Sequence, residues 1–433
     1  MRLAIIGAGY VGLVTAVCLA DKGHNVVCID NDINKIETLR KCKTTIFENN
    51  LQELMRKNSS KLTYTTKYDL AYKEADVIFI AVGTPEKVDG NANLDFLWNV
   101  VYELAKNVRR ECVLVIKSTV PIGTNEKVEE YLYNNKLDGA VFHVVSNPEF
   151  LSQGTAVNDT LQASRIIIGS NNDYAQKVML KVYERFDVPK LLTNRQSAEM
   201  IKYASNDFLA LKISYINEIA NLCEITGADI IDVVRGMSYD SRIGDKFLNA
   251  GIGYGGSCFP KDTKALHWMS TVYGKELRTV KAAIEVNEQQ KLILIKKASK
   301  YYDTFTNKKV AVLGLTFKPG TDDLREAPSI INVQALLDEK ANIFVYDPVG
   351  MNNFKKIYSD NITYCSDIRS ALFGADICFI FTEWDEIKQL TYDDFKLMHR
   401  PIILDGRNCY SLEYISTFPV IYESIGRKII KNI

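Results

Sequence analysis

The chain has 433 residues, of which 47% are hydrophobic and 24% are charged. This is the composition of a globular protein with a large core, and the length suggests about two to four domains. The 53 basic and 53 acidic residues cancel, so neither nucleic acid nor an anionic membrane is expected as a partner. No uninterrupted apolar run reaches ~18 residues, which argues against a membrane-spanning helix.

The first predicted domain, residues 1–195, alternates strands and helices. It opens on a core strand at residues 3–7, which leaves no room for a signal peptide. A helical pattern follows to about Lys22. Further apolar strand runs occur at residues 25–30, 77–82, 113–117 and 141–146. Such an alternation, with strands that are apolar throughout, is typical of a parallel, doubly wound sheet.

The second predicted domain, residues 196–303, is helical. Residues 198–226 carry apolar side chains at helical spacing without a proline, and the pattern stops at Gly227. This exceeds the length of a typical globular helix. Because its apolar residues occupy more than one face, we expect it to pack between two domains or across a subunit interface.

The third predicted domain, residues 304–433, returns to the α/β pattern. Strands are expected at residues 309–313, 342–346, 377–381 and 401–405, with a helix over residues 329–338. The layout resembles the first domain but lacks a full GxGxxG motif. The predicted fold class is therefore α/β, with two Rossmann-like doubly wound domains joined by a helical central domain that contains a long helix.

The strongest local motif is the run GAGYVG from Gly7 to Gly12, between the first strand and the first helix. Its glycines permit a tight turn, approach of the backbone to a pyrophosphate and close helix–strand packing, with the phosphates at the helix N-terminus. Asp30 ends the second strand about twenty residues on, where a carboxylate accepts hydrogen bonds from the adenosine ribose. Its charge would repel a 2′-phosphate, so NAD is favoured over NADP. Lys35, one turn onward, could approach the ribose or a phosphate.

Three loops directly follow predicted strands, at residues 83–85, 117–121 and 147–150. Open α/β sheets bind ligands at the carboxyl ends of their strands. Thr84 and Thr119 are therefore expected near the cofactor, and Glu149 near the substrate. The Thr-Pro pairs could instead only begin turns, but three such loops on one edge favour a site.

A glycine-rich loop at residues 253–262 runs into a predicted helix. Pro260 suits the first turn of that helix. Cys258 would lie at its N-terminus beside Lys261, a setting that favours the nucleophilic thiolate. Asp262 could orient water or accept a proton. The spacing leaves open a plainer interpretation, an inert core cysteine and an aspartate that only stabilises the helix end.

Lys202 and Asn206 are four residues apart and share one face of the long helix. The lysine could neutralise a developing oxyanion and the asparagine could hold it. By itself such a pair is more often a solvated helix face.

The cysteines and histidines indicate compartment and metal content. Nine scattered cysteines, an odd number without a CxxC pair, fit a reducing cytoplasm. Four isolated histidines lack metal-ligand spacing, so no metal is expected.

Seven separated motifs together resemble the UDP-glucose/GDP-mannose dehydrogenase family. They are residues 7–12, 117–123, 147–159, 198–218, 253–262, 314–325 and 405–407, in order over nearly the whole chain. Within the family, residues 198–218 and 242–262 are most similar to the members that act on UDP-glucose.

The resemblance implies an NAD-dependent, four-electron oxidation of UDP-glucose to UDP-glucuronate through a thiohemiacetal and a thioester on Cys258. Lys202 and Asn206 match residues that stabilise oxyanion character. Asp262 and Glu149, with Thr119, match the group that handles water and protons, and either carboxylate could be the base.

The resemblance also implies two sets of binding residues. The cofactor set is Gly7, Gly9, Tyr10, Val11, Gly12, Asp30, Lys35, Thr84, Thr119, Gln153, Lys261 and Arg325. The substrate set is Glu149, Phe150, Leu151, Lys202, Asn206, Arg242, Phe247, Asn249, Tyr254, Gly255, Phe317, Lys318 and Arg407. Phe317 and Lys318 match a loop that contacts UDP. Arg242 matches a residue that reaches the sugar from the neighbouring subunit in some members. We also expect a homodimer, built on the long helix.

Gln153 departs from the family pattern, in which a glutamate often stands at this position. Glutamine keeps the hydrogen bonding but cannot take a proton, so the base is sought at Glu149 or Asp262.

Several alternatives stay open on the sequence alone. Family members that oxidise UDP-N-acetylhexosamine or GDP-mannose share the scaffold. A two-electron NAD hydroxyacid or phosphogluconate dehydrogenase has no use for a cysteine in the glycine loop or for a third α/β domain. A non-catalytic NAD sensor or scaffold is disfavoured by Lys202, Asn206, Cys258 and Asp262.

Overall fold

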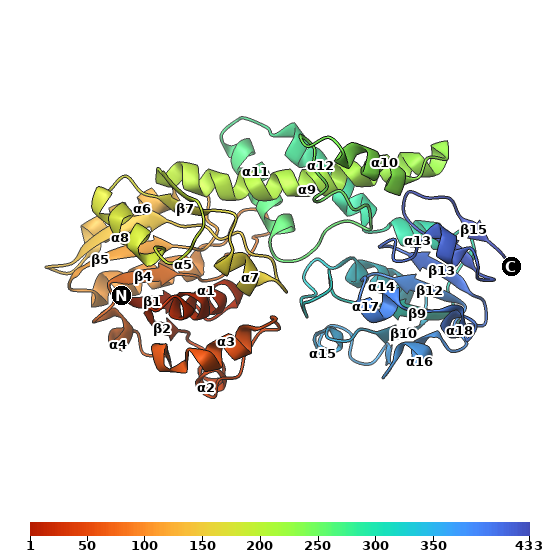
Figure 1. Ribbon diagram of the computed structural model, residues 1–433, viewed down its shortest axis with the longest axis horizontal. Helices are drawn as coiled ribbons and strands as arrows, with labels where there is room; N and C mark the ends of the chain where they lie inside the picture. Colours follow the sequence, from red (N-terminus) through yellow and green to blue (C-terminus); the bar gives the residue numbers. More distant parts are fainter. The chain divides into compact units, whose positions relative to one another are not determined.

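Strands and helices alternate from the first residues, and the first sheet has eight strands (Figure 1). The computed structural model describes residues 1–69 and 71–433. The chain forms two units, Met1–Ser205 and Asn206–Ile433. In the first unit the strand order is β3-β2-β1-β4-β5-β6-β7-β8, and all neighbours are parallel except β6 and β7. Its first six strands have the order of dinucleotide-binding folds.

The strands of the first unit confirm the predicted ones to within two residues at each end. They are β1 (Arg2–Ile6), β2 (Asn25–Ile29), β3 (Leu62–Thr65), β4 (Val77–Ile80), β5 (Glu111–Ile116), β6 (Val141–Ser146), β7 (Ile166–Gly169) and β8 (Lys190–Thr193). The helices are α1 (Tyr10–Asp21), α2 (Ile33–Arg40), α3 (Leu51–Lys57), α4 (Tyr68–Tyr72), α5 (Asp95–Asn107), α6 (Thr124–Asn135), α7 (Ala156–Leu161) and α8 (Asp173–Val182), with the short helix η1 (Ser59–Lys61). The strands β3, β7 and β8, of four residues each, were not predicted.

Apolar side chains cover both faces of this sheet. Leu3 and Ile5 of β1 pack in the cluster that includes α1, α2, α3, α7 and α8. Ala4 and Ile6 pack in the opposite cluster with α4, α5 and α6. Successive strand residues point to opposite faces, so a strand buried on both sides is apolar throughout.

Between β8 and β9 every element of this fully described stretch is a helix. The helices are α9 (Arg195–Thr226), α10 (Ile230–Ser238), α11 (Phe259–Val272), α12 (Arg278–Gln290) and α13 (Ile293–Ala298). The predicted long helix is α9, which has 32 residues and starts three residues earlier than expected. It ends as predicted at Gly227, whose φ of +81° suits a glycine after a helix C-terminus. The boundary between the two units falls inside α9, and the three-domain division at residues 195 and 303 stays a prediction.

The second sheet has seven strands in the order β11-β10-β9-β12-β13-β14-β15, with only the β14–β15 pair antiparallel in this described sheet. The strands are β9 (Lys309–Leu313), β10 (Asn342–Tyr346), β11 (Thr363–Tyr364), β12 (Ile377–Ile380), β13 (Ile402–Asp405), β14 (Ile421–Glu423) and β15 (Ile430–Lys431). The helices are α14 (Pro328–Asp338), α15 (Met351–Phe354), α16 (Ile368–Leu372), α17 (Asp385–Lys388), α18 (Tyr392–Phe395) and α19 (Leu412–Ile415). The four predicted strands and the predicted helix are confirmed, whereas the short β11, β14 and β15 were not predicted.

Two features of the whole chain bear on the sequence-based expectations. None of the helices among the described residues combines the length and apolarity that crossing a membrane requires. None of the nine cysteines, all of which lie in the described part of the chain, forms a disulfide.

Candidate active site

The GAGYVG run fills the turn between β1 and α1. Gly7 has a φ of +99°, and a Cβ there would lie 2.6 Å from the carbonyl oxygen of Ala81. A Cβ on Gly12 would lie 1.8 Å from the carbonyl oxygen of Gly7. These two glycines are therefore required by the turn itself.

Gly9 has a different surrounding. No described heavy atom lies within 4 Å of a Cβ built on it, and it is the N-cap of α1, which has no side-chain cap in the described part of the chain. Tyr10 and Val11 form the first turn of α1 and are half-buried. Open space beside uncapped helix N–H groups fits the pyrophosphate of a dinucleotide.

Asp30 follows β2 directly and is buried. Its Oδ2 accepts hydrogen bonds from the N–H of Ala8 at 2.8 Å and from Lys35 Nζ at 3.0 Å. Its Oδ1 accepts the N–H of Asp32 at 3.1 Å. The carboxylate is thus fixed beside the glycine turn, where it fits the hydroxyls of an adenosine ribose.

The loop that carries Gln153 contacts the first turn of α1. The hydroxyl of Tyr10 and the carboxylate of Glu48 both accept the N–H of Gly154, at 2.9 and 2.7 Å, and the Tyr10 hydroxyl donates to Glu48. Gln153 itself is half-buried. Glu48 was not predicted as a site residue, because it is an isolated acidic residue in the loop that joins α2 to α3.

The three predicted strand-end loops contact one another. Thr84 is buried, and its Oγ1 donates to the carbonyl oxygen of the half-buried Thr119 at 2.8 Å. Lys117 Nζ donates to Asn147 Oδ1 at 3.3 Å. Burial lowers the pKa of Lys117 to about 8. The loops at residues 83–85, 117–121 and 147–150 therefore form one edge, as the sequence predicts.

Glu149 and Lys202 form a buried ion pair, with side-chain exposures of 8% and 3%. Lys202 Nζ lies 3.0 Å from Glu149 Oε1 and donates to the Glu149 carbonyl oxygen at 2.6 Å. The N–H of Leu151 donates to Glu149 Oε2 at 2.8 Å. The solvated-face interpretation is therefore wrong for Lys202, because the sequence pattern does not show what packs over a helix face.

Phe150 lies between two cations in the same loop. Lys202 Nζ is 5.4 Å from the centre of its ring, and Arg165 Cζ is 3.9 Å from it. A cavity of about 290 Å³ borders this loop, and its lining includes Lys117, Glu149 and Arg165. The first unit thus has a hollow with both polar and apolar lining beside Glu149.

In the second unit the glycine loop leads into α11, as the sequence predicts. Cys258 is the N-cap of α11 and Pro260 lies in its first turn. Cys258 is half-buried, with its Sγ 3.8 Å from Ser257 Oγ. An inert core cysteine does not fit this position, whereas a thiol at a helix N-terminus is placed for reactivity.

Asp262 lies one turn along α11 and is buried. Its Oδ2 accepts a hydrogen bond from Nδ2 of the buried Asn206 at 2.6 Å. Its Oδ1 accepts from Lys261 Nζ. The two donors stabilise a negative charge on Asp262, and the bond from Asn206 joins α9 to α11.

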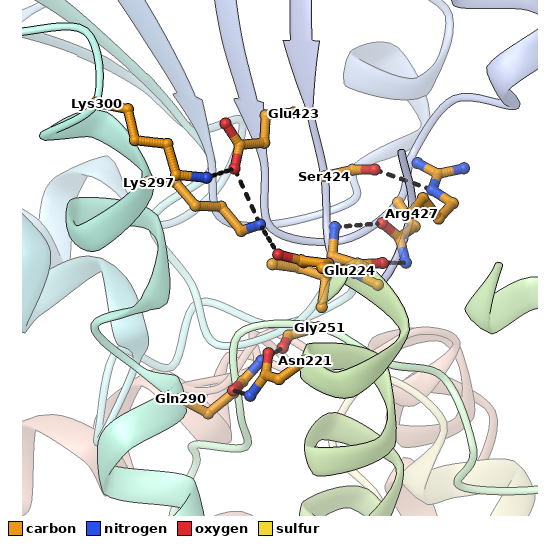
Figure 2. Close-up of polar contacts among 12 residues, drawn as sticks. Asn221, Glu224, Gly251, Gln290, Lys297, Lys300, Glu423, Ser424 and Arg427 are labelled. Atoms are coloured by element: carbon orange, nitrogen blue, oxygen red, sulfur yellow. Dashed lines mark hydrogen bonds and ion pairs between the residues drawn. The ribbon is translucent and has the colours of Figure 1, made fainter. Parts of the chain in front are cut away.

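Buried amide side chains hold the backbone of the glycine loop. Asn287 Oδ1 accepts the N–H of Tyr254 at 2.7 Å, and its Nδ2 donates to the carbonyl oxygen of the same residue at 3.1 Å. Asn217 Oδ1 accepts the N–H of Gly251, and Gln290 Nε2 donates to the Gly251 carbonyl oxygen (Figure 2). These amides were missed, because polar residues within helical stretches usually indicate a solvated face.

The glycine loop packs against the loop after β9. A Cβ on Gly255 would lie 2.4 Å from the carbonyl oxygen of Glu326, and one on Gly256 would lie 2.8 Å from the ring of Phe317. Arg407 joins both loops, since it donates to the carbonyl oxygens of Phe317 at 3.0 Å and Gly253 at 3.4 Å. Glycine at these positions is thus required by close approach.

The remaining predicted substrate residues of the second unit lie around this contact. Tyr254 is buried with its ring against Phe259. Lys318 Nζ is 5.8 Å from the centre of the Phe317 ring. Phe247 has a left-handed φ of +62° and its ring centre is 6.0 Å from that of Phe259.

Three predicted residues lie at the surface of their unit. Arg242 is 89% exposed and forms an ion pair with Asp240 at 2.6 Å, and Asn249 is exposed. Arg325 forms an ion pair with Asp323 at 2.6 Å. Asp323 is the main cause that raises the pKa of Arg325, and Cys258 contributes, which places this cation near the thiol of Cys258.

Comparison with known proteins gives matches over the whole chain. Sequence models of the UDP-glucose/GDP-mannose dehydrogenase family match residues 1–187 (NAD binding domain), 196–289 (central domain) and 311–412 (UDP binding domain). UDP-glucose 6-dehydrogenase YwqF of Bacillus subtilis (strain 168) is 46% identical over 99% of this chain and 98% of its own.

Solved structures agree with the sequence matches. A UDP-glucose dehydrogenase from the hyperthermophilic archaeon Pyrobaculum islandicum superposes with a TM-score of 0.92 at 35% identity, covering 98% of each chain. A UDP-D-ManNAc dehydrogenase from Pyrococcus horikoshii has a TM-score of 0.86 at 27% identity and covers 100% of each chain.

Proposed function

The chain belongs to the UDP-glucose/GDP-mannose dehydrogenase family, and we propose that it oxidises UDP-glucose to UDP-glucuronate with NAD as the electron acceptor. The observation that carries the chemistry is the half-buried thiol of Cys258 at the N-terminus of α11, one turn from the buried carboxylate of Asp262. A two-electron dehydrogenase has no use for such a nucleophile.

The choice of UDP-glucose over other nucleotide sugars rests on the relatives. Two full-length relatives, at 46% and 44% identity, are named UDP-glucose 6-dehydrogenase, whereas the compared structure named for an N-acetylated sugar is 27% identical. We therefore assign UDP-N-acetylhexosamine and GDP-mannose as the second candidates.

In this proposal the turn at Gly7–Gly12 would hold the pyrophosphate of NAD, and Asp30 would hold its adenosine ribose. Lys35 and Thr84 are assigned to the same ligand, as are Thr119 and Gln153. When bound, NAD accepts a hydride from the sugar carbon. The chain's own residues then have to hold the sugar between two such transfers.

Cys258 supplies that hold. Oxidation of the primary alcohol gives an aldehyde, and the thiolate adds to its carbonyl carbon to form a thiohemiacetal. A second oxidation leaves a thioester, and water breaks the C–S bond to give the carboxylate and the free thiol. Lys202 and Asn206 stabilise the oxyanion character of these species, because an ammonium and an amide donor favour negative oxygen in a dry site.

We assign Asp262 as the base that activates the hydrolytic water. It lies one turn from Cys258 on α11, and its two donors fix its orientation. Glu149, in contrast, is engaged by Lys202 and by the N–H of Leu151, so its role is to orient the ammonium. Gln153 replaces a family glutamate without loss of the base, since Asp262 performs that step.

The nucleotide half of the substrate is assigned to the second unit. Phe317, Lys318 and Arg407 are grouped around the glycine loop, together with Tyr254 and Gly255. We further propose the three-domain division at residues 195 and 303, which the separate family matches to 1–187, 196–289 and 311–412 support.

A homodimer built on α9 is proposed from its exposed apolar stripe. Phe208, Tyr215 and Leu222 recur every seven residues and are 62%, 50% and 55% exposed. Side chains at this spacing lie on one side of a helix, and such a stripe is unusual on a monomer's surface. The exposed Arg242 could then reach a neighbouring subunit's sugar. The nine free cysteines support a cytoplasmic location.

The substrate assignment is tested by NADH release with UDP-glucose, UDP-N-acetylglucosamine, UDP-N-acetylmannosamine and GDP-mannose at equal concentrations. We expect kcat/KM for UDP-glucose to exceed that of every other sugar by at least ~100-fold, since an unaccommodated substituent or a lost hydrogen bond costs this much or more. A higher kcat/KM for any other sugar would overturn the assignment.

A further inference from the structure

Asp207 lies next to Asn206 on α9, and the proposed mechanism gives it no role. Its side chain is 6% exposed, and neither carboxyl oxygen has a hydrogen-bond partner among the described residues. A carboxylate in these surroundings has no donor to replace its lost hydration, so the neutral acid is the favoured form. Burial first, and the charge of Asp262 second, raise the pKa of Asp207 to about 8.

Two ionisable side chains face Asp207 from neighbouring elements of the second unit. The like charge of Asp262 on α11 acts directly on it. Tyr254 of the glycine loop also lies near: burial is the main cause that raises the pKa of this phenol, and the charge of Asp207 adds to the rise. On its own helix, Tyr203 lies one turn earlier. Asp207 thus lies among groups whose charged form, a carboxylate or a phenolate, is negative.

The two carboxyl groups are in opposite situations. Asp262 accepts hydrogen bonds from Asn206 and Lys261, which stabilise its negative charge, whereas Asp207 has no donor. Two carboxyls that share a site cannot both ionise without repulsion. The two donors therefore favour a negative charge on Asp262, and Asp207 is the neutral member of the pair near neutral pH.

We propose that Asp207 is a positioning residue of this active site: as a neutral acid it leaves Asp262 as the single negative charge beside Cys258, and when it ionises it repels Asp262 and slows the reaction. The idea rests on the proposed function, in which Asp262 activates water. Asparagine at position 207 would keep the shape of the neutral acid and could not ionise.

The first test compares kcat for UDP-glucose oxidation in the Asp207→Asn variant and in the unaltered protein from pH 7 to pH 9.5. The ratio of variant to unaltered kcat should be within about two-fold of one at pH 7 and should rise by about three-fold or more at pH 9.5, with little change in KM. Asp207→Ala, a second variant without the charge, should show the same rise from a lower starting value. A ratio that stays flat with pH in both variants would overturn the proposal.

A matched control comes from another buried acid on α9. Glu199 is buried, accepts hydrogen bonds from Asn125 and from the N–H of Gly123, and has its pKa raised mainly by burial. In Glu199→Gln the kcat ratio should not rise above pH 8, because the groups that act on Glu199, which are Asn125, Gly123 and Glu126, do not include Asp262. An equal rise in this control would assign the effect to the loss of any buried acid and would refute the specific role of Asp207.

The second test needs no catalysis. The pKa of Asp207 is 3.8 in the unfolded chain and about 8 in the folded chain. Between pH 3.8 and about pH 8, the folded chain therefore holds a proton on Asp207 that the unfolded chain has lost. The contribution of Asp207 to the free energy of unfolding then falls as pH rises through this window. The free energy of unfolding of Asp207→Asn relative to the unaltered protein should therefore increase from pH 4 to pH 8 and level off above it. A difference independent of pH would refute the neutral acid and leave the dehydrogenase assignment standing. Failure of the unaltered protein to oxidise UDP-glucose would refute the dehydrogenase assignment and would leave the neutral acid at Asp207 standing.

Discussion

Cys258 is the residue on which the proposed chemistry depends most, since it alone can keep the half-oxidised sugar in place. We predict that Cys258→Ser lowers overall turnover of UDP-glucose by roughly 10³-fold or more, as removal of a covalent nucleophile does. NAD binding should stay within about two-fold by calorimetry, because the glycine turn belongs to the other unit. Full activity in the variant would sink the covalent mechanism.

Residue types at the right spacing were visible in the sequence, but their surroundings were not. Cys258, Lys261 and Asp262 could be proposed because a glycine-rich loop followed by Pro260 predicts a helix start. The burial of Lys202 against Glu149 could not be predicted, because the two residues are 53 positions apart in sequence. Asp207 gave no signal either, since an aspartate on a helix is usually solvated.

At the scale of elements, the glycine turn offers a pair of substitutions with opposite consequences. Gly9→Ala places a methyl group where no described atom lies within 4 Å, so thermal stability should be nearly unchanged while NAD affinity falls at least ~10-fold, equivalent to about 1.4 kcal/mol.

Gly12→Ala is the matched variant of the same turn. Its Cβ would lie 1.8 Å from the Gly7 carbonyl oxygen, so the melting temperature itself should drop. Calorimetric melting and NAD titration of both variants check the pair. Equal loss of stability in both, or full NAD affinity in Gly9→Ala, would contradict the assignment of the open space to the cofactor.

A network of charges ties α9 and α13 to the end of β14 in the second unit (Figure 2). Lys297, 3% exposed, lies 2.6 Å from Glu224 and 3.2 Å from the buried Glu423. Lys300 also contacts Glu423, at 2.6 Å, but is 51% exposed. The same β14 carboxylate thus has one buried and one solvated partner.

We predict that Lys297→Met destabilises the protein by about 3–5 kcal/mol, because it removes the buried cation between the two carboxylates and leaves Glu423 with only the exposed Lys300 as an ion-pair partner. Lys300→Met should cost no more than about 1 kcal/mol, since an exposed pair is screened by water. Urea unfolding midpoints measure both. Similar shifts of the unfolding midpoint in the two variants would contradict the prediction that the buried lysine contributes more stability than the exposed one.

Long, uniformly apolar strands could be predicted from the sequence, and short ones could not. The strands β1, β2, β9 and β10 were found because five consecutive mostly apolar residues stand out. The two-residue β11 and β15 depend on pairing partners far along the chain, which a local pattern does not contain.

On the scale of the whole molecule, the exposed stripe on α9 predicts self-association. Light scattering should show a species of twice the 48.9 kDa chain mass. Replacing Tyr215 with aspartate should shift it to the monomer, because a charge in the centre of an apolar interface is left without a partner. Exposed Tyr273→Asp, away from the stripe, is the control. A monomeric unaltered protein would contradict the dimer.

The central claim is that one sugar is oxidised twice without leaving the enzyme. It is tested most directly by the amount of NADH formed when a limiting, weighed quantity of UDP-glucose is consumed to completion with excess NAD. The covalent route through Cys258 predicts two NADH per sugar, with UDP-glucuronate as the product and no free aldehyde trapped by semicarbazide. One NADH per sugar, with an aldehyde product, would contradict it.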